Sequence, residues 1–370
     1  MSGFNGSTYP GLIGMVNPHR RRNITLSCIA ILIFIAFLYL AQHGFILDSY
    51  GVRVLRLCMV YSICALSLNL IQGYTGQFSL GSAGFMAVGA YTTAILSMPD
   101  ETRNAVYYLA PMAGWLQKLH LPYGLALLLG GLLAGVVAFL IGFPVLRLKG
   151  DYLSIATLGF SEIIRIVLNN AQSVSNGATG LKSIPATANL WWCFGALVLI
   201  LLFMTRLFRS SYGRAFMAIR DDEVAAEAMG VPIFKHKMMA FIASAVIAGI
   251  GGGLLASVMG AITPVLFRHL MSYDILLVMV LGGTGTMTGA ILGGSLFIIA
   301  KEALRFMDSG FAIGPIRIPA IAGLRMVVFS VLLMIVVLFY RSGLSGGKEF
   351  SWDRIFSRHG KKREKVGSEK

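Results

Sequence analysis

The chain has 370 residues, of which 56% are hydrophobic and 13% are charged, whereas soluble globular domains carry about 25% charged residues. This deficit excludes an ordinary soluble domain and indicates a chain surrounded by lipid. The net charge of +15 does not indicate a nucleic-acid partner, because much of it lies in two end segments, residues 20–22 and 361–365. Basic residues in such positions set membrane orientation and contact anionic lipid.

Long apolar runs follow one another through most of the chain, and a spanning helix needs about 20 such residues. The first run, from Ile24 to Ala41, is longer than the apolar core of a cleaved signal sequence and is expected to be the first span. We therefore expect an all-α polytopic membrane protein with about ten transmembrane helices. The expected spans are residues 24–42, 54–72, 77–97, 123–145, 151–170, 189–206, 238–259, 272–284, 288–300 and 319–340.

The segment 272–284 is too short for a full straight span, so a broken or re-entrant helix is the alternative for residues 272–300. The spans divide the chain into a cytoplasmic N-terminal arm (1–23), a transmembrane domain (24–340) and a basic cytoplasmic tail (341–370). No soluble domain fits between the spans, and the largest polar internal segment is 207–237.

Lysine and arginine residues fall unevenly on the two sides that ten crossings define. They concentrate in the segments that share a side with both termini, above all at 206–237 and in the tail. Because cytoplasmic loops carry an excess of positive charge, we expect both termini to lie in the cytoplasm.

Glycine is frequent, with 43 residues, and many of these lie inside apolar runs. Gly249 and Gly253 are four residues apart, as are Gly285, Gly289 and Gly293. Small residues at this spacing let two helix backbones approach closely. The pattern predicts a tightly packed bundle and does not identify a substrate.

Two glycine-interrupted segments, 73–90 and 282–294, also carry hydroxyl and amide side chains. Irregular backbone at membrane depth occurs only inside protein or beside a watery cavity, and such segments in both halves of a transporter point to a pathway built from repeats. The alternative is simple helix packing. The side chains expected along the pathway are Gln77, Ser79, Ser82, Glu162, Thr284 and Thr286.

Glu162 and Arg165 lie three residues apart within a predicted span, so they can pair on one helix face. A self-neutralising pair that holds helices in register explains them as well as a role in transport does. The four cysteines lie in apolar runs and the six histidines lie at segment ends or in loops. The sequence therefore predicts no metal site, no catalytic group and no cofactor.

The segment 212–237 is expected to form two short helices. The first is amphipathic and ends near Arg220. Either Asp221 or Asp222 suits the N-cap of the second helix, and Gly230 suits the end of that helix. The second helix offers alanines and acids rather than large apolar residues opposite a basic face. A groove on another protein therefore fits this helix better than a lipid surface does.

The same loop resembles the EAA-type coupling loop of ATP-binding cassette (ABC) importer permeases. Four further stretches resemble, in the same order, the branched-chain amino acid ABC transporter permease family: residues 79–96, 150–170, 175–185 and 262–294. The resemblance runs from about residue 53 to 340 and implies an ABC importer permease fold. It assigns to the coupling loop Arg220, Asp221, Asp222, Glu223, Ala225, Ala226 and Gly230.

The resemblance implies that the chain translocates branched-chain or related amino acids across the bacterial inner membrane. The implied partners are a second permease subunit, two ATP-binding subunits and a periplasmic substrate-binding protein, beside membrane lipid. The chain is not expected to be an enzyme. ATP hydrolysis is expected on the separate ATP-binding subunits, because the sequence contains no GxxxxGK[ST] loop.

Three alternatives remain at this point. The first is a urea or short-chain amide permease of the same family. The second is a passive channel, which leaves the partner-like loop unexplained. The third is an intramembrane enzyme, which would need a nucleophile with a partner at depth, and the sequence contains neither a GxSxG motif nor an intramembrane histidine.

Overall fold

The computed structural model describes residues 20–42, 44, 48–107, 111–117, 119–148 and 150–305, with the short pieces 311–313, 316–318, 327–331, 334, 343–346 and 349. Contacts divide the chain into two units, residues 53–347 and a second unit formed by 1–52 with 348–370. The first predicted span forms the helix α1 (Arg20–Gln42) in the second unit. The bundle of residues 53–347 carries the candidate site.

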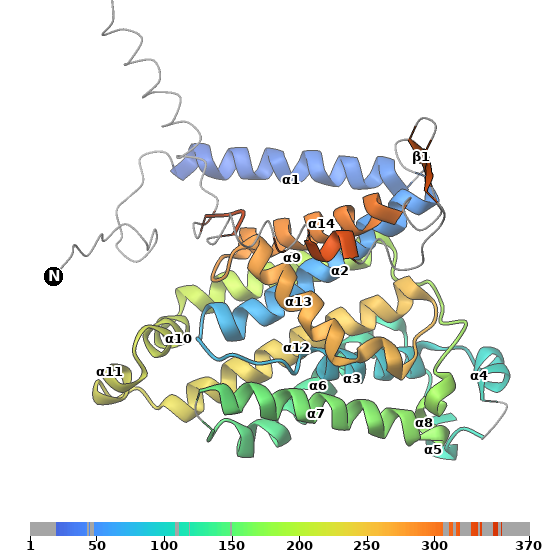
Figure 1. Ribbon diagram of the computed structural model, residues 1–370, viewed down its shortest axis with the longest axis horizontal. Coiled ribbons are helices and arrows are strands. Elements are labelled where there is room, and N and C mark those ends of the chain that lie inside the picture. The colour runs from blue at the N-terminus through green and yellow to red at the C-terminus, as the bar shows by residue number, and fades with distance from the viewer. Residues whose placement is uncertain are drawn as a thin grey trace, which may run out of the picture. The chain divides into compact units, whose positions relative to one another are not determined.

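The described part of the chain is almost entirely helical, as the apolar runs predict (Figure 1). After α1 the elements are α2 (Ser49–Leu68), the π-helical turn η1 (Asn69–Gly73), α3 (Ser82–Ser97), α4 (Asp100–Val106), α5 (Gly114–Gln117), α6 (Tyr123–Val145), α7 (Asp151–Asn170), α8 (Gln172–Ser175), η2 (Gly177–Thr179), α9 (Leu190–Arg209), α10 (Ser211–Asp221), α11 (Glu223–Ala228), α12 (Ile233–Met259), η3 (Pro264–Phe267), α13 (His269–Gly282), α14 (Met287–Ala303), β1 (Phe311–Ile313) and β2 (Ile316–Ile318). The antiparallel β1–β2 hairpin pairs Phe311 with Ile318 and was not predicted.

Three helices, α3, α6 and α12, pack against one another to form the core. Their backbones touch at glycines: a Cβ on Gly89 of α3 would lie 2.1 Å from the carbonyl oxygen of Gly249 on α12. A Cβ on Gly130 of α6 would lie 2.9 Å from the carbonyl oxygen of Gly89. The close approach predicted at Gly249 is confirmed, and such approach provides the dispersion contacts that hold helices together in lipid.

Gly285 does not belong to the glycine stripe that its spacing predicts. It lies in the turn between α13 and α14 with φ +76°, and α14 begins only at Met287. Gly289 and Gly293 do pack α14 against α13, because added Cβ atoms would lie 2.6 Å from the Gly282 oxygen and 2.3 Å from the Val278 oxygen. The predicted stripe is therefore wrong at its first member.

Five helical segments in the described residues are long and apolar enough to cross a bilayer: α2 with η1, α6, α7, α9 and α12. α13 and α14 form one further candidate, but they are bent by 120° at their junction, as in a broken span or a re-entrant loop. The count of ten crossings is not confirmed. The segment predicted as 77–97 is helical only over the 16 residues of α3, and the last predicted span, 319–340, lies largely outside the described residues.

The bundle of residues 53–347 has two different ends. α10 and α11 project from one end, whereas α4, α5 and α8 gather at the other (Figure 1). α6 and α9 finish, and α12 begins, at the α10–α11 end, so Arg147, Arg206, Arg209 and Lys237 collect there. This is the distribution that the basic-residue bias predicts for a cytoplasmic face.

Candidate functional site

The loop between α9 and α12 folds as the two predicted helices. Asp222 separates them, and its Oδ1 accepts hydrogen bonds from the N–H groups of Val224 (2.9 Å) and Ala225 (3.0 Å). Of the two candidate caps, Asp222 is therefore the one used. Gly230 follows α11 with φ +82°, a left-handed conformation that favours glycine at the end of a helix.

The outward surface of α11 includes two of its three alanines, Ala225 and Ala228, whereas the third is buried. Ala226 is buried and faces the protein, whereas Val224 and Met229 are 77% and 83% exposed. Glu223 points the other way and pairs with Lys237 of α12 (Oε2 to Nζ, 2.6 Å). Apolar side chains this exposed on a short helix favour contact with another surface.

Arg220, in the last turn of α10, joins the loop to the first glycine-rich segment. Its Nη1 donates to the carbonyl oxygen of Gly73 (3.1 Å), and Asp221 accepts from its Nη2 (2.9 Å). Its side chain lies against Gly76, where a Cβ would be 3.0 Å from the Arg220 Cγ. The loop is thus bonded directly to the point where the helix of α2 and η1 ends.

Asn69 connects this first break to the second break, the turn between α13 and α14. Its side-chain Nδ2 donates to the carbonyl oxygen of Thr286 (2.8 Å), and its Oδ1 accepts from the N–H of Gly285 (2.7 Å). A Cβ on Gly73 would lie 1.9 Å from that Oδ1. The two glycine-rich segments predicted from the sequence therefore meet, with Arg220 and Asn69 as the side chains that join them.

Hydroxyl groups surround the start of α3. Ser272 of α13 accepts from the N–H of Ala83 (3.2 Å) and lies 3.4 Å from the Oγ of Ser82. Thr157 of α7 accepts from the N–H of Leu80 (3.0 Å). These bonds satisfy N–H groups at and before the start of α3 that have no partner within the helix.

Gln77 and Ser79 lie in the non-helical segment before α3, and both are buried. The Nε2 of Gln77 donates to the carbonyl oxygen of Lys237 (3.4 Å), but its buried Oε1 has no hydrogen-bond partner among the residues that the structure describes. A buried acceptor without a partner costs stability. Gln77 is therefore the predicted pathway residue with an interaction left to make.

Glu162 and Arg165 form the predicted pair on α7, with Arg165 Nε donating to Glu162 Oε2 (2.6 Å). The other oxygen of Glu162 accepts from the backbone N–H of His269 (3.2 Å) and lies 3.4 Å from its Nδ1. Glu162 therefore also caps the start of α13 and ties it to α7. The interpretation that this pair holds helices in register has direct support.

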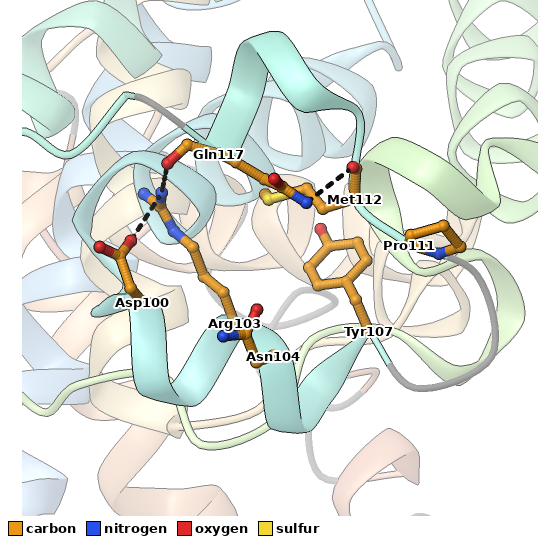
Figure 2. A pocket seen from close by; sticks show the side chains of 7 residues that line it. All are labelled: Asp100, Arg103, Asn104, Tyr107, Pro111, Met112 and Gln117. Carbon is orange, nitrogen blue, oxygen red and sulfur yellow. Dashed lines mark hydrogen bonds and ion pairs between the residues drawn. The ribbon is translucent and has the colours of Figure 1, made fainter.

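A pocket of about 340 Å³ lies at the opposite end of the bundle, among side chains of α4 and α5 and the segment between them (Figure 2). Arg103 is buried beside it and donates to the carbonyl oxygens of Ile95 (2.8 Å), Gln117 (3.1 Å) and Leu119 (2.6 Å). Burial raises the pKa of Tyr107 to about 12 although the charge of Arg103 acts to lower it. The Tyr107 hydroxyl, which donates to the Val174 carbonyl, thus stays protonated at neutral pH. Arg103 and Tyr107 thus hold neighbouring segments together through backbone carbonyl oxygens, and their arrangement does not indicate catalysis.

The structure brings together part of the predicted set. Thr286 and Arg220 both bond to the end of the helix of α2 and η1, through Asn69 and Gly73 respectively. Gln77 and Ser79 lie in the segment that follows η1, and Ser82 begins α3. Glu162 lies apart on α7, and Thr284 is exposed. Sequence reasoning missed Asn69, Ser272 and His269; the amide of Asn69 inside the apolar run 54–72 is the signal that could have found it.

The sequence profile of the family described as "Branched-chain amino acid transport system / permease component" matches residues 50–338. The high-affinity branched-chain amino acid transport system permease protein LivM of Escherichia coli K12 is 35% identical over 309 residues, which cover 74% of this chain and 68% of that protein.

Two relatives come from one organism, Methanocaldococcus jannaschii. The probable branched-chain amino acid transport permease protein LivM is 26% identical over 77% of this chain and 90% of its own length. The probable permease protein LivH is 23% identical over 70% of this chain and 84% of its own length. No solved structure matches the chain.

Proposed function

The chain belongs to the permease family of branched-chain amino acid transport systems, and on this basis we propose that it is a membrane-spanning subunit of an ATP-driven importer of branched-chain amino acids. The observation that carries the mechanism is the chain of contacts from Asp221 through Arg220 to Gly73, and from Asn69 to Gly285 and Thr286. A movement of the α10–α11 loop is transmitted by these bonds to both helix breaks.

The exposed face of α11 supports a partner outside the bilayer. Val224 and Met229 point away from the bundle, and Asp222 with Glu223 gives the start of α11 a negative charge. We assign this face to an ATP-binding subunit, one of two in the complete importer. A substrate-binding protein would then deliver substrate at the opposite end, and a second permease would complete the pathway.

The pathway is assigned to the surroundings of the two breaks. Irregular backbone at membrane depth needs polar partners inside the protein, and Gln77, Ser79, Ser82 and Thr286 provide groups of this kind. Within residues 74–81, the carbonyl oxygen of Phe78 accepts from Ser154 and the N–H of Leu80 donates to Thr157, both side chains of α7. Such a segment can shift when its neighbours shift, without breaking a regular helix.

The test is uptake of labelled leucine by cells that lack the chain and are then given back the wild-type gene or the Arg220→Met variant. Wild-type protein should restore ATP-dependent leucine uptake, and Arg220→Met should restore little, since methionine keeps the packing on Gly76 without the bond to Gly73. Restoration of urea uptake instead of leucine uptake would favour the amide permease. Uptake that survives depletion of ATP would favour a channel.

A further inference from the structure

Within the described residues, α7 and the start of α13 present an exposed apolar face. Only 22% of the apolar window of α7 is buried, which is the lowest value among the candidate spans described. Ile155, Gly159, Glu162 and Ile166 are spaced by four, three and four residues and form one stripe along the helix. Leu270 and Tyr273 of α13 are also exposed, next to the bond between Glu162 and His269.

This face carries charge at membrane depth. Glu162 lies 11 residues after Asp151 in a 20-residue helix, which places it about 16 Å along the helix axis. The side chains of Glu162, Arg165 and His269 are 26%, 21% and 44% exposed. Ionisable side chains within spans almost always face protein or a watery cavity, because lipid does not solvate them.

The other two well-exposed spans lack such groups. α6 contains no Asp, Glu, His, Lys or Arg, and α9 contains none before Arg206. Their exposed side chains include Leu128, Leu132, Leu199 and Leu202. Lipid can cover these two faces, whereas lipid on the α7–α13 face would surround a carboxylate and a guanidinium that are each only partly covered.

We propose that the α7–α13 face is the contact surface for the second permease, a related but different membrane chain that presents polar groups at the depth of Glu162. This assignment rests on the proposed function, since it requires a two-permease importer. The occurrence of a LivM and a LivH relative in one organism supports a related chain rather than a second copy as the occupant.

The experiment places the photoreactive residue p-benzoyl-phenylalanine at single positions of the chain in cells that make the complete importer. Ile163 and Ile166 test the proposed face, and Tyr152 adds a position whose aromatic ring the probe resembles. Leu132 on α6 and Leu199 on α9 are matched controls, because they are 60% and 63% exposed against 53% for Ile163. Illuminated membranes are analysed for adducts by electrophoresis and mass spectrometry.

Adducts with the second permease from the α7 positions, at least tenfold more abundant than from Leu132 or Leu199, are expected. Equal adducts from α6 or α9, adducts with a second copy of this chain, or no protein adduct from any α7 position would overturn the proposal. Leucine uptake is measured in the same cells with wild-type protein. Adducts without leucine uptake would support the proposed contact surface and contradict the proposed substrate. Leucine uptake without adducts would contradict the contact surface alone.

Discussion

Asn69 is the residue on which the meeting of the two helix breaks depends. It is fully buried, and both ends of its amide are used by residues more than 200 positions away in the sequence. No other residue type of this size both donates and accepts in that geometry, since glutamine is longer and aspartate lacks the donor. The amide therefore fixes the distance between η1 and the α13–α14 turn.

Replacing Asn69 with leucine should reduce leucine uptake strongly, because the Gly285 N–H and the Thr286 carbonyl lose their partner. Each buried group left unsatisfied costs about 1–3 kcal/mol. Uptake and the melting temperature of the purified importer are measured together. Ser67→Ala is the control, since it removes a buried hydrogen bond to Ser244 (2.8 Å) without touching either break. Equal uptake by the two variants would reduce Asn69 to a packing role.

Gly230 gives a second prediction for a single residue. A Cβ there would meet nothing within 4 Å, so the cost of Gly230→Ala is conformational, about 1 kcal/mol at φ +82°. Less ATP-binding subunit should co-purify with the alanine variant. Gly230→Asn should be milder, because asparagine tolerates the left-handed conformation. If the alanine and asparagine variants retain equal amounts of the ATP-binding subunit, backbone strain at this turn does not determine the position of α11.

At the scale of elements, α11 shows why an exposed face cannot be read from composition. Three of its six residues are alanines, and the buried one, Ala226, packs inside the loop. An Ala226→Glu variant would disturb that packing and so would not test docking. Ala225 and Ala228 are exposed, and so are two larger apolar side chains, Val224 in α11 and Met229 directly after it.

Val224→Glu and Met229→Glu should each lower co-purification of the ATP-binding subunit several-fold while the chain still inserts in the membrane. Both changes place a carboxylate in an apolar contact, where it loses hydration without gaining a partner. Ala218→Glu on α10 adds the same charge to an exposed position of the neighbouring helix and should have little effect. A wild-type yield of complex from both α11 variants would return the lipid-surface interpretation of this loop.

At the scale of the whole molecule, the bend between α13 and α14 bears on the side of the membrane that each terminus occupies. A 120° bend largely reverses the direction of the chain, as in a re-entrant loop. Counting this pair as two crossings, or as a re-entrant loop with none, keeps the number of crossings even, whereas a single broken span would make it odd. The prediction that both termini are cytoplasmic therefore requires that residues 272–300 do not form a single crossing.

Single cysteines at Arg20 and Ser357 should resist a membrane-impermeant maleimide in intact cells and react after permeabilisation. Cys28 is replaced by serine in all variants, and the other three cysteines, Cys58, Cys64 and Cys193, are buried, which keeps the reaction of native thiols low. Glu101→Cys, on the exposed side of α4 at the opposite end of the bundle, should react in intact cells. Reaction at residue 20 or 357 from outside would refute the orientation.

The class of the protein and its local structure follow from the amino-acid sequence. Apolar runs of span length predict a membrane bundle because lipid admits few other structures, and α6, α7, α9 and α12 lie where those runs place them. The two helices of the loop, the N-cap at Asp222 and the turn at Gly230 also follow from the sequence, because caps and turns depend on residues only a few positions apart.

The contacts between those elements are set by tertiary packing. Asn69 reaches Thr286 across 217 positions, Glu162 reaches His269 across 107, and neither contact leaves a local pattern in the sequence. The direction of Ala226, the turn at Gly285 and the partial exposure of Glu162 are likewise set by packing. Hydrogen bonds between distant segments form only once the helices are in place, so a one-dimensional pattern of polar and apolar residues cannot specify them.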